Sequence, residues 1–217
     1  MRVLVVGGLG FVGERLTARL EAAGHEVTVI DKRAPESGAD NIIRADVRSL
    51  QAIAKHFIGQ DVVINLAAEH QDDVRPLSLY DEVNVGGARN VCKAAEAADV
   101  PRIIFTSSVA IYGENPLPVT EATEPNFFND YGRTKYEAEL VYKEWQASKA
   151  GRSLTIVRPT VIFGPGNRGN VYNLFRQIKY GPFIMIGDGR NVKSIAHVEN
   201  VAGFLMHVLD CPAEAEV

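Results

Sequence analysis

Apolar runs alternate with amphipathic segments along most of the chain, which predicts a sheet of parallel strands connected by helices. The apolar runs, which read as buried strands, lie at residues 2–6, 25–30, 42–45, 61–68, 102–108 and 154–158. The segments with helical apolar spacing lie at residues 13–23, 49–57, 77–98 and 131–149. Strands that alternate with helices predict an α/β fold with a doubly wound parallel sheet (the Rossmann fold) and right-handed crossovers.

One edge of this sheet collects residues that could hold a ligand. Ligands of doubly wound sheets bind beyond the carboxyl ends of the strands. The positions that follow the predicted strands are Gly7, Asp31, Asp46, Ala67, Ser108 and Pro159. We therefore expect the functional site at this edge.

The pattern changes after Phe163, so we expect the sheet domain over residues 1–163 and a small second part over 164–217. The second part reads as a loop, a helix, a strand, and a segment that leads into a last helix. These lie at residues 164–169, 171–179, 183–186, 193–197 and 198–209. We expect this part to be interleaved with the last elements of the sheet.

The first turn carries the spacing Gly7-x-x-Gly10-x-x-Gly13 between a strand and a helix. The first glycine permits a tight turn, the second lets the backbone approach a pyrophosphate, and the third lets the helix pack against the sheet. The helix N-terminus offers N–H groups and a partial positive charge to phosphates. The alternative is a strand–helix–strand unit whose glycines only make a turn.

Asp31 ends the second strand, where a carboxylate can accept both hydroxyls of an adenosine ribose. Lys32 and Arg33 follow, and a cation there could hold a 2′-phosphate. Because the Asp31 carboxylate would repel that phosphate, the sequence favours NAD over NADP. Asp31 as a simple turn residue stays an alternative.

The reactive group is expected to be Tyr131, with Lys135 one helical turn further on and Ser108 at a strand end. A free tyrosine titrates near pH ~10. A fixed ammonium close by favours the phenolate, as would a nearby cationic nicotinamide ring, so we expect Lys135 and a bound cofactor to lower the pKa of Tyr131. Ser108 could orient a substrate hydroxyl beside Tyr131. Without this context, such a pair is an ordinary packed aromatic and a solvated cation.

Composition excludes several other classes of function. The 217 residues are 46% hydrophobic and 23% charged, with a net charge of -4, which argues against a nucleic-acid or anionic-membrane surface. The longest apolar run is too short for a membrane span, and the N-terminus reads as a core strand rather than a signal peptide. Cys92 and Cys211 lie far apart, which fits a reducing cytoplasm. The histidines show no metal-ligand spacing, so no metal is expected.

Taken together, these motifs resemble the extended short-chain dehydrogenase/reductases, in the NAD-dependent epimerase/dehydratase branch that includes UDP-galactose 4-epimerase. The resemblance covers nearly the whole chain. It rests on Gly7-x-x-Gly10-x-x-Gly13, Asp31, Asp46-Val47, Leu66-Ala67-Ala68, Asn84, Ser107-Ser108 with Tyr112-Gly113, Tyr131-x-x-x-Lys135 and Arg158-Pro159.

The resemblance implies a cofactor-binding role for residues along the whole sheet edge. The expected NAD contacts are Gly7, Gly10, Phe11, Val12, Gly13, Asp31, Lys32, Arg33, Asp46, Val47, Leu66, Ala67, Ala68, Asn84, Ser107, Tyr131, Lys135, Pro159 and Thr160. It implies that Tyr131 removes a hydroxyl proton while hydride passes to NAD, and that an epimerase returns the hydride to the other face of a keto intermediate. The expected catalytic residues are Ser108, Tyr131 and Lys135.

The substrate implied is a nucleotide-sugar, with Asn173 and Lys193 at positions that grip the nucleotide and Ser108 on the reacting hydroxyl. The chain departs from the pattern at Val161, where an Asn is common, and at Lys193, which replaces an Arg. The family also continues beyond this length, so we expect a shortened substrate part.

Three functions stay open from the sequence. The first is a nucleotide-sugar epimerase, suggested by Ser108, Tyr131 and Lys135 together with Asn173. Dehydration is disfavoured, because no Asp-Glu pair follows Ser108 as the resemblance to dehydratases would require. The second is a net oxidoreductase on a sterol-like or other non-sugar alcohol, suggested by the apolar run 161–163. The third is a catalytically silent NAD-binding module. The resemblance also implies a homodimer through the helices at 77–98 and 131–149.

Overall fold

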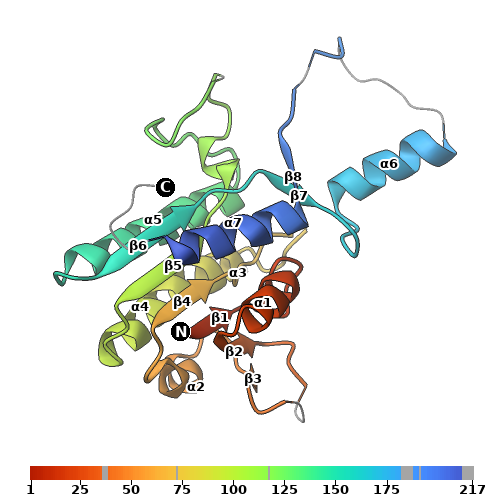
Figure 1. The fold of residues 1–217 in the computed structure, drawn as a ribbon. Helices are drawn as coiled ribbons and strands as arrows, with labels where there is room; N and C mark the ends of the chain where they lie inside the picture. Colours follow the sequence, from red (N-terminus) through yellow and green to blue (C-terminus); the bar gives the residue numbers. More distant parts are fainter. Residues whose placement is uncertain (36–38, 72, 117, 182–187, 191, 212–217) are drawn as a thin grey trace.

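The central feature is a six-stranded parallel sheet. The computed structural model describes residues 1–217 apart from 36–38, 72, 117, 182–187, 191 and 212–217. The strands are β1 (Arg2–Val6), β2 (Glu26–Asp31), β3 (Ile42–Arg44), β4 (Val62–Asn65), β5 (Arg102–Thr106) and β6 (Ser153–Val157). Their order is β3-β2-β1-β4-β5-β6, and every neighbouring pair is parallel. The predicted doubly wound sheet is therefore confirmed (Figure 1).

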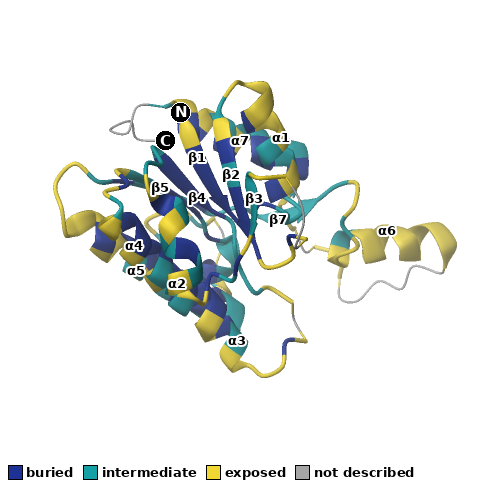
Figure 2. Ribbon diagram, turned by 90° about the horizontal axis from the view of Figure 1, so that it is seen from below, coloured by how far each residue is buried: buried dark blue, intermediate teal, exposed yellow. Residues whose placement is uncertain are grey.

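Helices cover both faces of the sheet, which explains why its strands are apolar on both sides. One face carries α1 (Gly13–Ala22) and α7 (Val198–Asp210), and the other carries α2 (Leu50–Ile53), α4 (Gly87–Ala97) and α5 (Asp130–Ala147) (Figure 2). Successive residues of β1 point to opposite faces, so Leu4 joins the core under α4 and α5 while Val5 joins the core under α1 and α7.

Two predicted helices are less regular than their apolar spacing suggests. The segment expected at 77–98 consists of α3 (Ser78–Tyr80), the π-helical η2 (Asp81–Gly86) and α4. The segment expected at 49–57 is α2 followed by the 3-10 helix η1 (Ala54–Phe57), and the Ser49 side chain caps it by accepting from the Ala52 N–H. Side-chain periodicity does not distinguish these helix types over so few residues. The π-helical turns contain Asn84, whose contacts are described below.

The carboxyl-terminal part adds a second, two-stranded parallel sheet. It pairs β7 (Val161–Phe163) with β8 (Ile195–His197), and α6 (Asn170–Tyr180) lies between them in the chain. Figure 1 shows α6 standing away from the main sheet. The sequence did not predict β7 or β8, because three residues carry too little periodicity. The strand expected at 183–186 lies outside the described residues, and the domain boundary at 163 stays a prediction.

Two further expectations concern partners of the chain. No helix within the described ranges is long and apolar enough to cross a membrane. The helices α4 and α5 pack side by side on the same face, as a shared dimer surface would require (Figure 2). The homodimer itself stays a prediction, which sedimentation would check.

Candidate active site

The glycine turn has the backbone geometry that the sequence predicts. Gly7 has a φ of 81°, and its N–H donates to the Ile30 carbonyl at 2.7 Å. A Cβ on Gly13 would lie 2.6 Å from the Gly7 carbonyl oxygen, so only glycine lets α1 start this close to the turn. Gly7 and Gly13 therefore hold the end of β1 and the start of α1 together.

The start of α1 suits a phosphate. No side chain caps the helix at its N-cap residue, Val12, and although the Glu14 N–H donates to the Gly10 carbonyl at 3.0 Å, the positive end of the helix dipole faces the turn. A Cβ on Gly10 would lie 3.1 Å from the Gly7 oxygen, close enough to disturb the turn. The residues present at this turn thus fit the pyrophosphate of a dinucleotide.

Asp31 is buried at the end of β2, where its carboxylate bridges the turn and the next loop. It accepts hydrogen bonds from the backbone N–H of Leu9 at 3.1 Å and of Arg33 at 2.9 Å. The Arg33 guanidinium also donates to both carboxylate oxygens at 3.2 Å. Burial acts to raise the pKa of Asp31, but the hydrogen bonds from Arg33 and Leu9 outweigh it and the pKa is lowered. The carboxylate is therefore charged at neutral pH, and Arg33 is committed to it.

The neighbouring cofactor positions on this side are Lys32, Asp46 and Val47. Lys32 lies 3.9 Å from the Glu69 carboxylate and is exposed. Hydrogen bonds from Arg48 lower the pKa of Asp46. Val47 is buried against Gly87, whose missing side chain makes room for it.

Buried amides fix the loop that follows β4. Asn65 accepts from the Ala67 N–H at 3.0 Å and donates to the Tyr142 hydroxyl at 2.6 Å. Asn84 accepts from the Glu69 N–H at 2.8 Å, and its amide nitrogen donates to the Glu69 carbonyl at 3.1 Å. These bonds hold the backbone on both sides of Ala67 and Ala68, and Leu66 precedes them.

Two of the residues that fix this loop were missed from the sequence. Thr134 accepts a hydrogen bond from the Asn84 amide at 2.9 Å, which joins α5 to the π-helical segment. Asn65 sits among apolar strand residues, and a polar residue inside such a run was the one signal that could have identified it.

The three predicted catalytic residues lie where β5 ends and α5 begins. The Ser108 hydroxyl accepts from the Ala110 N–H at 3.1 Å and so starts the 3-10 helix η3 (Val109–Tyr112). Asn129 caps α5 one residue before it begins, which fixes the position of Tyr131 in its first turn. The Ser108 hydroxyl lies near enough to the Tyr131 phenol to act on its pKa, which it lowers.

Lys135 is fully buried beside the same strand end. Its ammonium donates to the Thr106 carbonyl at 2.6 Å and lies 4.4 Å from the centre of the Phe105 ring. Burial lowers the pKa of Lys135 to about 7, against an opposing effect of the Glu139 carboxylate.

The expected acidification of Tyr131 is wrong for the protein residues alone. Burial raises the pKa of Tyr131, Tyr80 adds to the rise, and Ser108 only partly offsets them. Lys135 has no part in this balance because its ammonium is directed at the Thr106 carbonyl. A phenolate at Tyr131 therefore needs a further positive charge in the site.

Ser107, Pro159 and Thr160 complete the edge of the sheet. The Ser107 hydroxyl is buried and has no hydrogen-bond partner within the described residues. The Pro159 carbonyl accepts from the Val109 N–H at 3.1 Å, which ties the end of β6 to η3. Thr160 follows half-buried.

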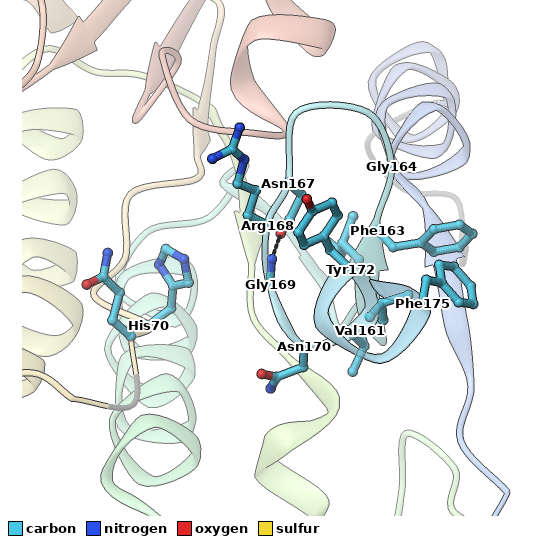
Figure 3. Close-up of a pocket in the computed structure, with 13 residues that line it drawn as sticks. His70, Val161, Phe163, Gly164, Asn167, Arg168, Gly169, Asn170, Tyr172 and Phe175 are labelled. Carbon is cyan, nitrogen blue, oxygen red and sulfur yellow. Dashed lines mark hydrogen bonds between the residues drawn. The ribbon is translucent and has the colours of Figure 1, made fainter. Parts of the chain in front are cut away.

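A cavity of about 550 Å³ lies on the substrate side, between the loop after β4 and the elements after β6. Apolar side chains of β7 and α6 line one part, and Asn167, Arg168 and Asn170 line another. Figure 3 shows His70, in the loop after β4, on the opposite side of the cavity from Asn167 and Arg168.

The two predicted nucleotide contacts do not lie in this cavity wall. Asn173 is exposed on α6, and Lys193 is exposed before β8. Val161, where the sequence pattern leads one to expect an Asn, does line the cavity. His197 has a structural role: it caps α7 by accepting from the Glu199 N–H and packs edge-on against Phe163.

These features can be compared with known proteins. Residues 3–217 match the NAD dependent epimerase/dehydratase family. The chain belongs to this family. Members of the family are NAD-dependent enzymes, so the predictions of an enzyme and of NAD as its cofactor are confirmed at this level.

Two relatives of known activity are similar to the chain over nearly its whole length. The chain is 48% identical over 208 residues to an N-acetyl-alpha-D-glucosaminyl-diphospho-ditrans,octacis-undecaprenol 4-epimerase of Escherichia coli O157:H7. The match covers 95% of this chain and 62% of that protein, so the chain spans less than two thirds of its relative. A UDP-glucose 4-epimerase of Vibrio cholerae is 29% identical over 223 residues, covering 98% of this chain and 68% of the relative.

Solved structures of NAD-bound epimerase-type proteins share the fold. MoeE5 in complex with UDP-glucuronic acid and NAD superimposes with a TM-score of 0.85 at 28% identity, over 98% of this chain and 73% of that one. The UDP-glucose 4-epimerase of Thermus thermophilus in complex with NAD gives 0.83 at 27% identity, over 98% and 75%. The roles of individual site residues in this epimerase-family chain stay predictions.

Proposed function

We propose that the chain carries the catalytic residues of an NAD-dependent epimerase that inverts a hydroxyl-bearing carbon of a diphosphate-linked sugar. The observation that supports it most is the meeting of Ser108, Tyr131 and Lys135 at the end of β5, on the sheet edge that also carries the glycine turn. NAD held at that turn would supply the acceptor and donor of the hydride and a positive charge beside the phenol.

The protein residues then have separate tasks. Ser108 holds the reacting hydroxyl next to Tyr131, and Tyr131 removes its proton and later returns one. Lys135 bonds the nicotinamide ribose, and the positive charge near the phenol is the one that the bound cofactor would supply. The keto intermediate of the sugar turns over between the two proton transfers, so the overall reaction is an isomerisation.

Two candidate substrates differ in the group that the diphosphate carries besides the sugar: a nucleoside in one, a polyprenyl chain in the other. A nucleotide-sugar follows from the resemblance and from the UDP-sugars in related structures. A polyprenyl diphosphate-linked sugar is favoured by the 48% identical relative and by the apolar cavity wall at Val161, Tyr172 and Phe175. With either substrate, the Arg168 guanidinium, which lines the cavity, would bind the negatively charged diphosphate.

The test measures epimerisation of two substrates, a UDP-sugar and a polyprenyl diphosphate-linked sugar, by the unchanged chain and by a Tyr131 variant. Tyr131→Phe is expected to keep NAD binding and lose epimerisation by at least about 100-fold, the usual contribution of a general acid–base. UDP-N-acetylglucosamine and its polyprenyl diphosphate counterpart should be compared without added cofactor. Unchanged turnover in Tyr131→Phe would refute the base assignment. Net consumption of NAD with a sterol-like alcohol would select the oxidoreductase alternative instead.

A further inference from the structure

A buried ion pair lies directly behind the catalytic residues. The Glu139 side chain is 0% exposed, and the Arg158 guanidinium binds both of its oxygens. The Arg158 Nε lies 2.9 Å from Oε1 and the Nη2 lies 2.6 Å from Oε2. This fork geometry uses the two carboxylate oxygens together, as only arginine can.

Glu139 is close enough to Lys135 to attract its ammonium, so the pairing of Glu139 with Arg158 affects where this ammonium points. The two residues are four apart in α5, so they lie on the same helix face, about 5–6 Å apart at Cβ. Oppositely charged side chains at this spacing ordinarily attract each other. The Lys135 ammonium instead donates to the Thr106 carbonyl at 2.6 Å, at the end of β5. Arg158 already occupies the carboxylate that would compete with this carbonyl.

Arg158 has further partners that fix it in place. Its Nη1 donates to the Tyr112 hydroxyl at 2.6 Å and to the Glu121 carbonyl at 3.1 Å. The guanidinium also lies 5.3 Å from the centre of the Tyr112 ring. Arg158 is therefore anchored from η3 and the following loop as well as from α5, and it cannot readily leave Glu139.

We propose that Arg158 is a positioning residue that binds both oxygens of Glu139 and so keeps this carboxylate from capturing the Lys135 ammonium. Lys135 then stays directed at the strand end where Ser108 and Tyr131 meet. Arg158 acts through Lys135 and does not touch the substrate or the cofactor. The inference rests on the proposed function only in the role given to Lys135.

The electrostatic surroundings of Lys135 agree with this arrangement. Besides burial, the Glu139 carboxylate is the group that acts on the pKa of Lys135, and this carboxylate is the one that Arg158 binds. Burial dominates the lowered pKa of Lys135, and Glu139 opposes it. A Glu139 carboxylate released from Arg158 would oppose the lowering of the Lys135 pKa more strongly.

The experiment is a double-mutant cycle on the full chain, read as the NAD dissociation constant by calorimetry. Arg158→Met is expected to weaken NAD binding about 10-fold, because the freed Glu139 draws Lys135 away from the ribose; this corresponds to about 1.4 kcal/mol. In a Lys135→Met background the same change should alter affinity less than about twofold. Adding Glu139→Gln to Arg158→Met should restore affinity to within about threefold of the original chain.

Control variants separate this effect from general loss of structure. Tyr112→Phe removes one partner of Arg158 but leaves the Glu139 pair, so its NAD affinity should be unchanged. If Arg158→Met does not fold, Arg158→Lys replaces it, because a lysine cannot hold both oxygens at once. Far-ultraviolet circular dichroism of every variant checks the fold.

An equal loss of affinity with Lys135 present and in the Lys135→Met background would overturn the proposal, as would a loss in Tyr112→Phe as large as in Arg158→Met. Failure of Glu139→Gln to restore affinity would overturn it too. The NAD measurements need no turnover. An absence of epimerisation would therefore contradict the proposed function, but the NAD affinities of the variants would still test the role of Arg158.

Discussion

Replacing Gly13 by alanine tests whether the close start of α1 is required for both folding and cofactor binding. The new Cβ would lie 2.6 Å from the Gly7 oxygen and from two backbone atoms of Gly8. That is about 0.8 Å inside an ordinary contact of about 3.4 Å, and all three atoms belong to a turn that cannot rotate away. Overpacking of this kind costs about 1–3 kcal/mol.

The expected result is a melting temperature about 5–10 °C below that of the unchanged chain, since a protein of this size loses about 2–4 °C per kcal/mol. Gly24→Ala is the matched control: Gly24 has a φ of 80° but nothing within 4 Å of a Cβ. Its cost is backbone strain alone, about 1–2 kcal/mol. Thermal unfolding should be followed by circular dichroism with and without NAD.

Two outcomes would refute this reasoning about Gly13. The first is a melting temperature within about 2 °C of that of the unchanged chain, the loss expected from less than about 1 kcal/mol. The second is a stabilisation by NAD equal to that of the unchanged chain, which at 100 times the dissociation constant is about 2.7 kcal/mol. Gly24→Ala should keep the whole of that stabilisation, because its site lies at the other end of α1.

Two smaller predictions follow from buried side chains. Asn84→Ala should destabilise the chain by about 2–3 kcal/mol in urea unfolding, because it leaves both backbone groups of Glu69 without their side-chain partner; a change below about 0.5 kcal/mol would contradict the role given to this amide. Burial raises the pKa of Cys92 to about 12, so its thiol stays protonated at pH ~8. Native protein should therefore react with Ellman's reagent at Cys211 only, and rapid reaction of the Cys211→Ser variant would count against that burial.

The main sheet and its glycine turn could be predicted because their signals are local. Buried parallel strands are continuous apolar runs, and a residue that must approach backbone closely has to be glycine. Gly7 and Gly13 therefore indicate their geometry within seven positions of sequence. Asp31 could be placed for the same reason, since it directly follows an apolar strand.

The environment of the catalytic residues could not be predicted in the same way. The spacing of Tyr131 and Lys135 placed both on one helix face, but it gave no information on what surrounds them. Burial, which raises the pKa of Tyr131, comes from segments remote in the sequence. The pairing of Arg158 with Glu139 joins a strand end to a helix, and no local pattern reveals it. The same holds for β7 and β8, which are short and separated by α6 in the chain.

The two sides of the site differ in how firmly their residues are held, and this difference bears on what each side does. On the cofactor side, buried side chains such as Asn84 and Asn65 bond the backbone directly, so the chain is fixed before any ligand arrives. On the side of the cavity, α6 contributes no buried residue, and the polar lining residues Asn167, Arg168 and Asn170 lie in the loop before α6 and at its first residue. A cofactor that stays bound through every turnover requires the first arrangement, whereas a substrate that enters and leaves can be served by the second. Differences in substrate among family members are therefore expected to arise at residues 161–175, while the edge built by β1, β4 and β5 keeps the chemistry the same.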